Sequence, residues 1–260
     1  MTSQSSLQQE RCCDDKWVNR EVELNNKAKG HYTDCPVCNG KMIVYKAVWN
    51  EDLGYWACVG SRCKCRAKYE SRQRLKKSGL ANLVDGKTFD NYVVENEAQH
   101  IAKTKAQRYE NGWFYIGGQS GFGKTHLCTA IAAKKIESGA DTLYMPWVDE
   151  IGELKREYYS DDFNEIFTKY KTVKFLYIDD LFKVKDLDSA NINRLEAEIA
   201  YQLLNYRYIN NLDTVISSEF TLQELYKIDS AMAGRIKDKC GDAFVTVVKD
   251  DRNNWRLKKH

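Results

Sequence analysis

Four short runs of apolar residues recur along the chain from residue 113 onward. They are rich in aromatic and branched side chains, which is typical of buried strands. The runs cover residues 113–118, 141–147, 173–182 and 213–219. The run at 173–182 is nearly continuous in its apolar part, as expected for a central strand that is covered on both faces.

Between these runs, apolar residues recur three or four positions apart. After Gly123 this pattern continues to Gly139, which predicts an amphipathic helix with a glycine stop. A longer helix is predicted over residues 189–210. Alternating strands and helices predict an α/β fold, a three-layer core with a parallel sheet and right-handed crossovers.

The first 80 residues follow a different pattern. Apolar residues alternate on either side of Asn50–Gly54, which predicts a β-hairpin. Residues 62–77 then carry eight Lys or Arg against one Glu. We therefore expect two domains, a small N-terminal one with a basic linker helix over 1–80 and a larger one over 81–260.

Composition narrows the class of protein. The chain has 260 residues, of which 43% are hydrophobic, enough for a real core. Its net charge of +3 gives no global argument for nucleic acid, and it has no apolar run long enough to span a membrane. No secretory signal opens the chain, so we expect a cytoplasmic protein. Nine cysteines in such a protein indicate metal binding or reduced thiols rather than disulfides.

The segment CPVC places Cys35 and Cys38 in a turn where two thiolates converge, as in zinc sites. A second pair must come from downstream, and the spacing leaves open Cys58 with Cys63 or Cys63 with Cys65. Four thiolates around a zinc ion (Zn2+) would give this small domain the core that it lacks. His31 is a possible replacement ligand, and reduced cysteines in a hairpin are the alternative.

The stretch GGQSGFGKTHL matches the pattern G-x-x-x-x-G-K-[ST] from Gly118 to Thr125, between a predicted strand and a predicted helix. Such a loop curls its backbone N–H groups around the phosphates of ATP, with the helix N-terminus behind it. Lys124 is expected at the β- and γ-phosphates, and the Thr125 hydroxyl at a magnesium ion (Mg2+). The expected nucleotide-binding residues here are Gly118, Gly121, Phe122, Gly123, Lys124, Thr125 and His126.

A second strand with acidic residues at its end should lie beside this loop. The run over 173–182 has such residues at its end, Asp179 and Asp180. Asp179 is expected to hold Mg2+ together with Thr125, and Asp180 to orient or deprotonate the attacking water. Ser218 and Glu219 end another predicted strand and could face the γ-phosphate, although a capped strand end explains them equally well.

The order of these parts resembles the AAA+ helicase-loader ATPases of the DnaC and DnaI type, most closely DnaC-like proteins of phages and prophages of Gram-positive bacteria. The resemblance covers nearly the whole chain from about Cys35. It rests on CPVC…CKC, SGL…TFDNY, GWFYIGGQSGFGKTHLCTAI, LYIDDLFK, LLNYRYINNLDTVISSE and AMAGRIKDK. It implies an ATPase that binds a replicative hexameric helicase of the DnaB type through its N-terminal domain. It also implies that the protein uses ATP and single-stranded DNA to place the helicase on DNA.

The resemblance also implies roles for single residues. It favours Cys63 and Cys65 as the second pair of zinc ligands. It places an arginine finger at Arg235, which would reach the ATP of a neighbouring subunit and so implies self-association through AAA+ interfaces. Arg207 is a second candidate. Many AAA+ proteins have Glu at the position of Asp180, so we expect slow intrinsic hydrolysis.

Surfaces that contact DNA are less clear from the sequence. Basic and aromatic residues mix in residues 147–159 and in residues 182–186, where Lys183 and Lys185 are candidates. The basic run over 62–77 is a third candidate, and a solvated helix explains each of them as well. Two other functions stay open, a transposition helper ATPase similar to IstB and a nucleotide-gated DNA-binding adaptor with little hydrolysis.

Overall fold

The structure is a computed structural model that describes residues 15–52, 54–84, 86–160, 162–183 and 192–247. The chain divides into two compact units, Met1–Arg72 and Gln73–His260. The division falls within the helix α3 (Cys65–Lys77), before the boundary expected at residue 80. Leu80 is fully buried in the core of the second unit, which explains why the second unit begins earlier.

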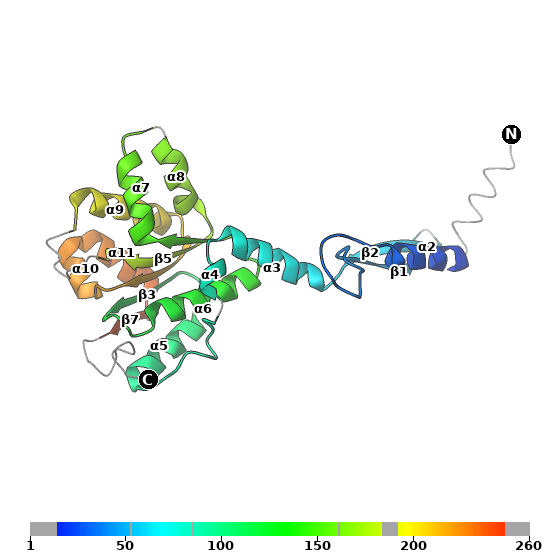
Figure 1. Cartoon of the computed structure of the whole chain (residues 1–260), viewed down its shortest axis with the longest axis horizontal. Coiled ribbons are helices and arrows are strands. Elements are labelled where there is room, and N and C mark those ends of the chain that lie inside the picture. Colours follow the sequence, from blue (N-terminus) through cyan, green and yellow to red (C-terminus); the bar gives the residue numbers. More distant parts are fainter. Residues whose placement is uncertain (1–14, 53, 85, 161, 184–191, 248–260) are drawn as a thin grey trace. The chain divides into compact units, whose positions relative to one another are not determined.

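The first unit contains the predicted hairpin, which is confirmed (Figure 1). Strands β1 (Ile43–Asn50) and β2 (Tyr55–Arg62) pair antiparallel, with Trp49 opposite Trp56. Helix α2 (Asp15–Lys27) packs on this hairpin through Asn26, which donates a hydrogen bond to the Tyr45 carbonyl and accepts one from the Tyr45 amide, both at 2.9 Å. One asparagine thus fixes the helix to the strand.

The second unit is built on a five-stranded parallel sheet in the order β4-β5-β6-β3-β7. Strands β3, β5 and β7 of this sheet are labelled in Figure 1. The strands are β3 (Trp113–Gly118), β4 (Thr142–Pro146), β5 (Phe175–Leu181), β6 (Asp213–Ser218) and β7 (Phe244–Val247). The first four coincide with the predicted runs. β7 was not predicted, because four residues with one exposed side chain give a weak pattern.

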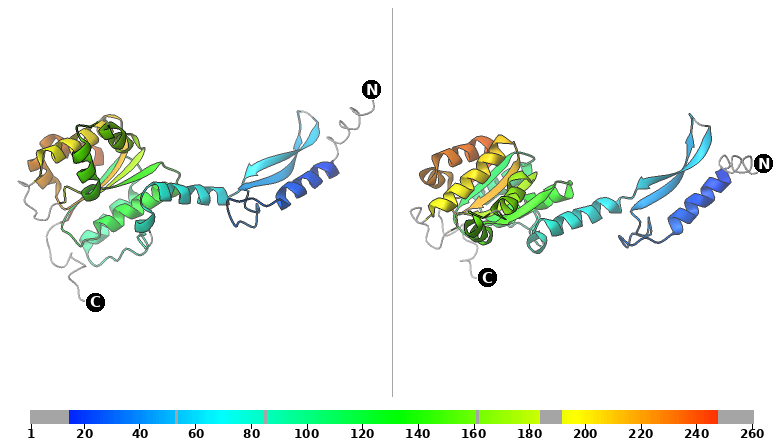
Figure 2. Two further views of the ribbon diagram at one scale, coloured as in Figure 1. Left: turned by 45° about the horizontal axis from the view of Figure 1, so that its top comes forward. Right: turned by 90° about the horizontal axis from the view of Figure 1, so that it is seen from above.

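Helices cover both faces of this sheet (Figure 2). On one face lie α4 (Ala81–Val84), α5 (Glu97–Arg108) and α6 (Lys124–Glu137). On the other lie α7 (Trp147–Glu157), α8 (Asp162–Thr172), α9 (Arg194–Ile209), α10 (Leu222–Ile228) and α11 (Ser230–Cys240). Alternate residues of β3 enter the two cores, Phe114 and Ile116 on the first face, Trp113 and Tyr115 on the second. The predicted three-layer α/β fold is confirmed.

The helix predicted over 189–210 corresponds to α9, and its residues 189–191 lie outside the described part of the chain. Among the described helices, none combines the length and the apolar character that crossing a membrane requires.

Candidate nucleotide-binding site and cysteine cluster

The loop between β3 and α6 requires its glycines. Gly118, Gly121 and Gly123 all have positive φ, at +123°, +79° and +94°. A Cβ atom on Gly118 would lie 2.1 Å from the carbonyl oxygen of Val247, and one on Gly123 would lie 2.7 Å from the ring of Tyr92. Any other residue at Gly118 or Gly123 would therefore clash as well as strain the backbone, and at Gly121 it would strain the backbone. The loop that the motif predicts is present between a strand and a helix.

Lys124 opens helix α6 and is almost fully buried. Its ammonium group donates hydrogen bonds to the carbonyl oxygens of Gly118 and Gln119, both at 2.8 Å. Burial lowers the pKa of Lys124, while the charges of Glu219 and Asp180 act in the opposite direction. The lysine is thus held within the loop, in the region where a phosphate chain would lie.

Asp179 lies at the end of β5, is 8% exposed and accepts four hydroxyl hydrogen bonds. Ser217 (2.5 Å), Tyr177 (2.7 Å) and Thr125 (3.1 Å) donate to Oδ1, and Tyr144 (3.1 Å) donates to Oδ2. These bonds compensate the cost of burying the carboxylate. The contact between Thr125 and Asp179 brings a hydroxyl and a carboxylate oxygen together, the hard donors that suit Mg2+.

Sequence reasoning missed the two tyrosines that hold Asp179. Burial raises the pKa of both Tyr144 and Tyr177, and the charge of Asp179 adds to it, so both remain neutral donors. A signal for Tyr177 exists, because it is two positions before Asp179 on one strand and so faces the same way. Tyr144 is paired with Tyr177 across β4 and β5, which only the register reveals.

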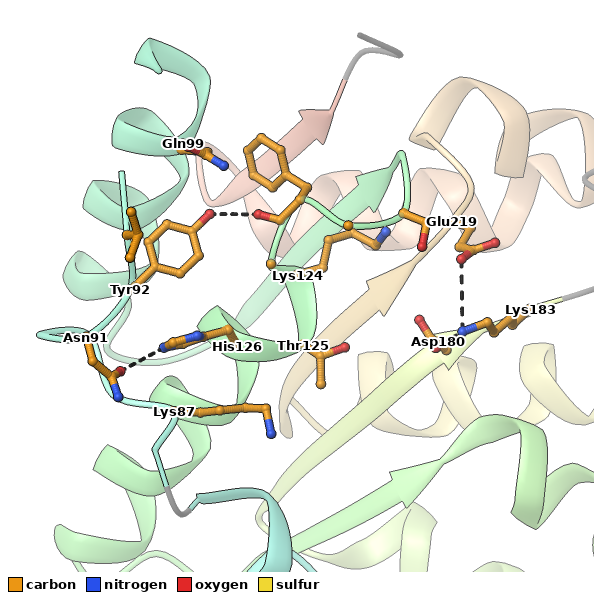
Figure 3. A pocket seen from close by; sticks show the side chains of 15 residues that line it. Lys87, Asn91, Tyr92, Gln99, Lys124, Thr125, His126, Asp180, Lys183 and Glu219 are labelled. Carbon is orange, nitrogen blue, oxygen red and sulfur yellow. Dashed lines mark hydrogen bonds and ion pairs between the residues drawn. The ribbon is translucent and has the colours of Figure 1, made fainter. Parts of the chain in front are cut away.

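Asp180 follows in a left-handed conformation, with φ +56°. Its amide donates to Ser217 Oγ at 2.9 Å, and its Oδ2 lies 2.6 Å from the ammonium nitrogen of Lys183. Figure 3 shows Lys183 between Asp180 and Glu219 at the edge of the pocket. The structure places Lys183 at the edge of the nucleotide pocket, and the expectation that it contacts DNA stays a prediction. Lys185 lies outside the described residues.

Of Ser218 and Glu219, the two residues expected at the nucleotide from the end of β6, only Glu219 lines the pocket. Ser218 is fully buried, donates to the Leu181 carbonyl at 2.8 Å and accepts from the Phe220 amide at 3.1 Å. The expectation that Ser218 faces the nucleotide is therefore wrong, because its hydroxyl is used between β5 and β6. Its neighbour Ser217 points to the carboxylate of Asp179 instead.

A segment before α5 forms one wall of the pocket, a role that sequence reasoning did not assign (Figure 3). Tyr92 donates to the Phe122 carbonyl at 2.9 Å, and its ring contacts His126 edge to face. His126 Nε2 faces two acceptors, the Thr88 carbonyl at 2.8 Å and Asn91 Oδ1 at 3.1 Å, so it carries the proton. Together with the loop, this wall encloses a cavity of about 380 Å³.

The two arginines considered as fingers lie in different environments. Arg207 is fully buried and donates to Thr214 Oγ1 and to four backbone carbonyls. Its role is structural, which corrects that candidate. Arg235 is half-buried on α11, where its guanidinium lies over the rings of Tyr201 (5.1 Å) and Tyr208 (5.7 Å). It does not line the pocket of its own chain.

In the first unit, the sulfur atoms of Cys35, Cys38, Cys63 and Cys65 all lie within 4.8 Å of one another. Burial acts to raise the pKa of Cys38, but hydrogen bonds from the Cys65 thiol and the Met42 amide outweigh it and lower the pKa to about 6. Four soft thiolates converging on one point fit a tetrahedral zinc ion. Within the described residues, Cys58 and His31 are not part of this group.

Known proteins resemble the chain over most of its length. Residues 66–260 match the family model of the IstB-like ATP binding protein. The uncharacterized protein YqaM of Bacillus subtilis (strain 168) is 29% identical over 235 residues, which cover 84% of this chain and 73% of that protein. The phage-like element PBSX protein XkdC of the same strain is 29% identical over 205 residues, covering 73% and 75%. The replicative helicase loader DnaC of Escherichia coli (strain K12) is 23% identical over 197 residues, covering 74% and 77%.

Solved structures show the same fold. AMPPCP-bound DnaA from Aquifex aeolicus matches with a TM-score of 0.52 at 19% identity, over 64% of this chain and 51% of that chain, so the match spans about half of DnaA. The crystal structure of DnaI matches with a TM-score of 0.51 at 22% identity, over 64% of this chain and 94% of that chain. The five-stranded parallel sheet thus matches the P-loop AAA+ core.

Proposed function

The chain belongs to the IstB-like and DnaC-like family of AAA+ ATP-binding proteins, and from this we propose that it is an ATP-dependent loader of a replicative DNA helicase. In this proposal it places a hexameric helicase on single-stranded DNA when replication starts. The observation that carries the proposal is the combination of two sites in one chain. One is a P-loop site with Thr125 against Asp179, and the other is a separate four-cysteine unit.

The proposed reaction is hydrolysis of ATP to ADP and phosphate. Mg2+ would be held by Thr125 and Asp179, and when bound it neutralises charge on the β- and γ-phosphates. Lys124 binds the phosphate chain from within the loop, since its ammonium group already lies among the loop carbonyls. Asp180 takes the proton of the attacking water. The cysteine cluster would hold zinc, which supplies the first unit with a structural centre.

The proposed partner surface is the first unit. On α2 and the hairpin it exposes several large apolar side chains, each more than 40% exposed, namely Trp17, Leu24, Val48, Trp49 and Val59. Such exposure in a small unit supports a role in docking on another protein. This surface is the proposed binding site for the helicase, as the resemblance to helicase loaders implies.

A mixing experiment tests the loader proposal. We expect the full chain and a purified replicative helicase to form a stable complex with several copies of the chain per hexamer, measured by gel filtration with light scattering. Deletion of residues 1–72 should abolish the complex, while Lys124→Ala, which leaves the first unit intact, should retain it. A complex formed equally well by residues 73–260 alone would contradict the assignment of the first unit.

A transposition helper ATPase remains the second candidate, favoured by the name of the matching family model. That match begins at residue 66, directly after the last of the four cysteines. The cysteine unit therefore lies outside the part that the family model describes, and a transposase-helper role does not account for it. A nucleotide-gated adaptor, the third possibility, would need the same pocket but no turnover.

Helix α3 is the proposed additional contact with the phosphates of single-stranded DNA. It has no buried residue, and its residues Lys68 and Arg72 are exposed four positions apart; Lys64, also exposed, directly precedes the first residue of the helix. Four residues of helix advance about 6 Å, so Lys68 and Arg72 lie one turn apart on one face of α3. The helix as a whole carries a single acid, Glu70, which pairs with Arg66.

Changing Lys64, Lys68 and Arg72 together to Ala should weaken binding of an oligothymidine. We expect the slope of log K against log salt to fall by about 2, because about 0.7 counterions are released per phosphate contact on a single strand. Fluorescence anisotropy at several salt concentrations measures both. The matched control is Lys29→Ala with Lys46→Ala, two exposed lysines of the same unit. An equal loss of DNA affinity in the control variant would show that the effect comes from the overall charge of the unit and not from these positions.

A further inference from the structure

The chain turns sharply at the end of β5, and this turn places Lys183 at the nucleotide pocket. Asp180 and Phe182 both have positive φ, at +56° and +60°, and the Lys183 amide donates to the Asp180 carbonyl at 3.0 Å. The pairing of β5 with β6 shifts register between Ile178 and Leu181. Left-handed conformations at non-glycine residues are costly and persist only where the surroundings enforce them.

The anchor of this turn is Phe182. Its side chain is fully buried and contacts the ring of Trp147 edge to face, with centroids 5.5 Å apart. Lys183 therefore follows a fixed residue, although 39% of its own side chain is exposed. The core thus fixes the backbone position from which the lysine side chain extends.

Lys183 lies between two carboxylates of the pocket (Figure 3). Its ammonium nitrogen is 2.6 Å from Asp180 Oδ2 and 4.0 Å from Glu219 Oε1. The side chains of these acids are only 23% and 13% exposed, so solvent screens the attraction less than at an open surface. One of the two oxygens of Asp180 is thereby engaged by a charged donor.

We propose that Lys183 is a positioning residue that restrains ATP hydrolysis by holding the carboxylate of Asp180. The inference rests on the proposed ATPase function and deepens it. In the reaction, the oxygen of water bonds to the γ-phosphorus, the bond from that phosphorus to the β-bridging oxygen breaks, and ADP leaves with the electron pair. The water proton passes to Asp180. While Lys183 is paired with Asp180, Oδ2 of that carboxylate is turned toward the ammonium group and is engaged there instead of accepting the proton.

Glu219 gives the lysine a second acceptor on the other side. A shift of the ammonium group from Asp180 toward Glu219 would free the base without moving the charge out of the pocket. Slow turnover is then a property of this pair, in addition to the shorter side chain of Asp180. A nucleotide switch benefits from such a restraint, because the ATP state then lasts until something releases it.

Single-turnover hydrolysis tests the proposal. Lys183→Met should hydrolyse bound ATP about tenfold faster than the unmodified protein, a part of what a general base contributes. The affinities for ATP and ADP should stay within about twofold. Lys183→Arg, which keeps the ion pair, should restore the slow rate. In an Asp180→Asn background, Lys183→Met should have no effect. The matched control is Lys174→Met, an exposed lysine directly before β5.

Two outcomes of this assay would overturn the proposal. If Lys183→Met hydrolyses more slowly and loses affinity for ATP but not for ADP, the lysine binds the γ-phosphate instead. If the rate rises equally in the Asp180→Asn background, the ion pair is not the cause. Thermal unfolding checks that the variants fold, and Lys183→Gln serves as a second neutral variant should Lys183→Met unfold.

A second measurement detects the ion pair between Lys183 and Asp180 without ATP hydrolysis. In the nucleotide-free protein, reductive methylation followed by mass spectrometry should modify Lys183 several-fold more slowly than Lys174. Asp180→Asn should remove most of this protection. Equal reactivity of the two lysines would refute the pair even if hydrolysis is normal. Conversely, protection of Lys183 in a protein that hydrolyses no ATP would retain the ion pair and reject the proposed ATPase function.

Discussion

Mixing Lys124→Ala protein with Arg235→Ala protein should restore ATP hydrolysis that neither variant shows alone. Arg235 lies on α11 over Tyr201 and Tyr208, and it does not line the pocket formed around Lys124. As the proposed arginine finger, it would therefore serve the pocket of another subunit. An arginine finger is worth roughly 10³–10⁵ in rate, so Arg235→Ala alone should lose at least about a thousandfold. Lys124→Ala removes the cation proposed to bind the phosphate chain.

The expected recovery follows from the interface. A working site needs an intact Lys124 from one subunit and an intact Arg235 from the next, so random mixing in equal amounts gives about a quarter of competent sites in a head-to-tail assembly. Steady-state phosphate release in the presence of single-stranded DNA measures the ATP hydrolysis that the mixture recovers. The matched control is Lys239→Ala on the same helix, whose ammonium nitrogen also lies over Tyr208, at 4.8 Å. It should retain activity.

The complementation has a clear contrary outcome. Full activity of Arg235→Ala by itself would remove the residue from catalysis. Inactivity of every mixture would contradict action across an interface, provided that light scattering shows mixed assemblies. Either result would return Arg235 to the packing role that its contact with the two tyrosines already describes.

The parts predictable from the sequence are those that a local pattern determines. The strand, glycine loop and helix around Gly118–Thr125 form one continuous stretch, so spacing alone predicted the P-loop and the strand before it. The same holds for the cysteines, because their spacing limited the possible clusters. The distances then chose Cys63 and Cys65 over Cys58, as the resemblance implied.

The parts that escaped prediction depend on contacts between distant segments. Tyr92, 30 positions before Phe122 in the chain, closes the pocket by a hydrogen bond to its carbonyl. Ser217 and Ser218 are neighbours on a strand, and their opposite directions decide which one reaches Asp179. Lys183 looked like a surface cation in the sequence, and only the left-handed turn at Asp180 and Phe182 returns it to the pocket.

Loss of zinc should unfold the first unit while the second unit keeps its nucleotide site. The first unit has few buried apolar side chains, Val18, Cys38 and Cys63 among its described residues, so its core is too small to be stable alone. Binding of zinc to such a site contributes on the order of 10 kcal/mol to folding. Cys63→Ser removes one of the four ligands and should abolish stoichiometric zinc.

A matched control for Cys63→Ser is a serine substitution of Cys58. Cys58 lies on β2 outside the cluster, where its sulfur accepts a weak hydrogen bond from Asn25 at 3.7 Å, so Cys58→Ser should retain one zinc per chain. Metal analysis after gel filtration measures the zinc, and limited proteolysis locates the damage. In Cys63→Ser, cleavage should concentrate before Gln73, and a fluorescent ATP analogue should bind as before. Because the nucleotide site has its own core and its own sheet, loss of ATP binding together with zinc would contradict the independence of the two units.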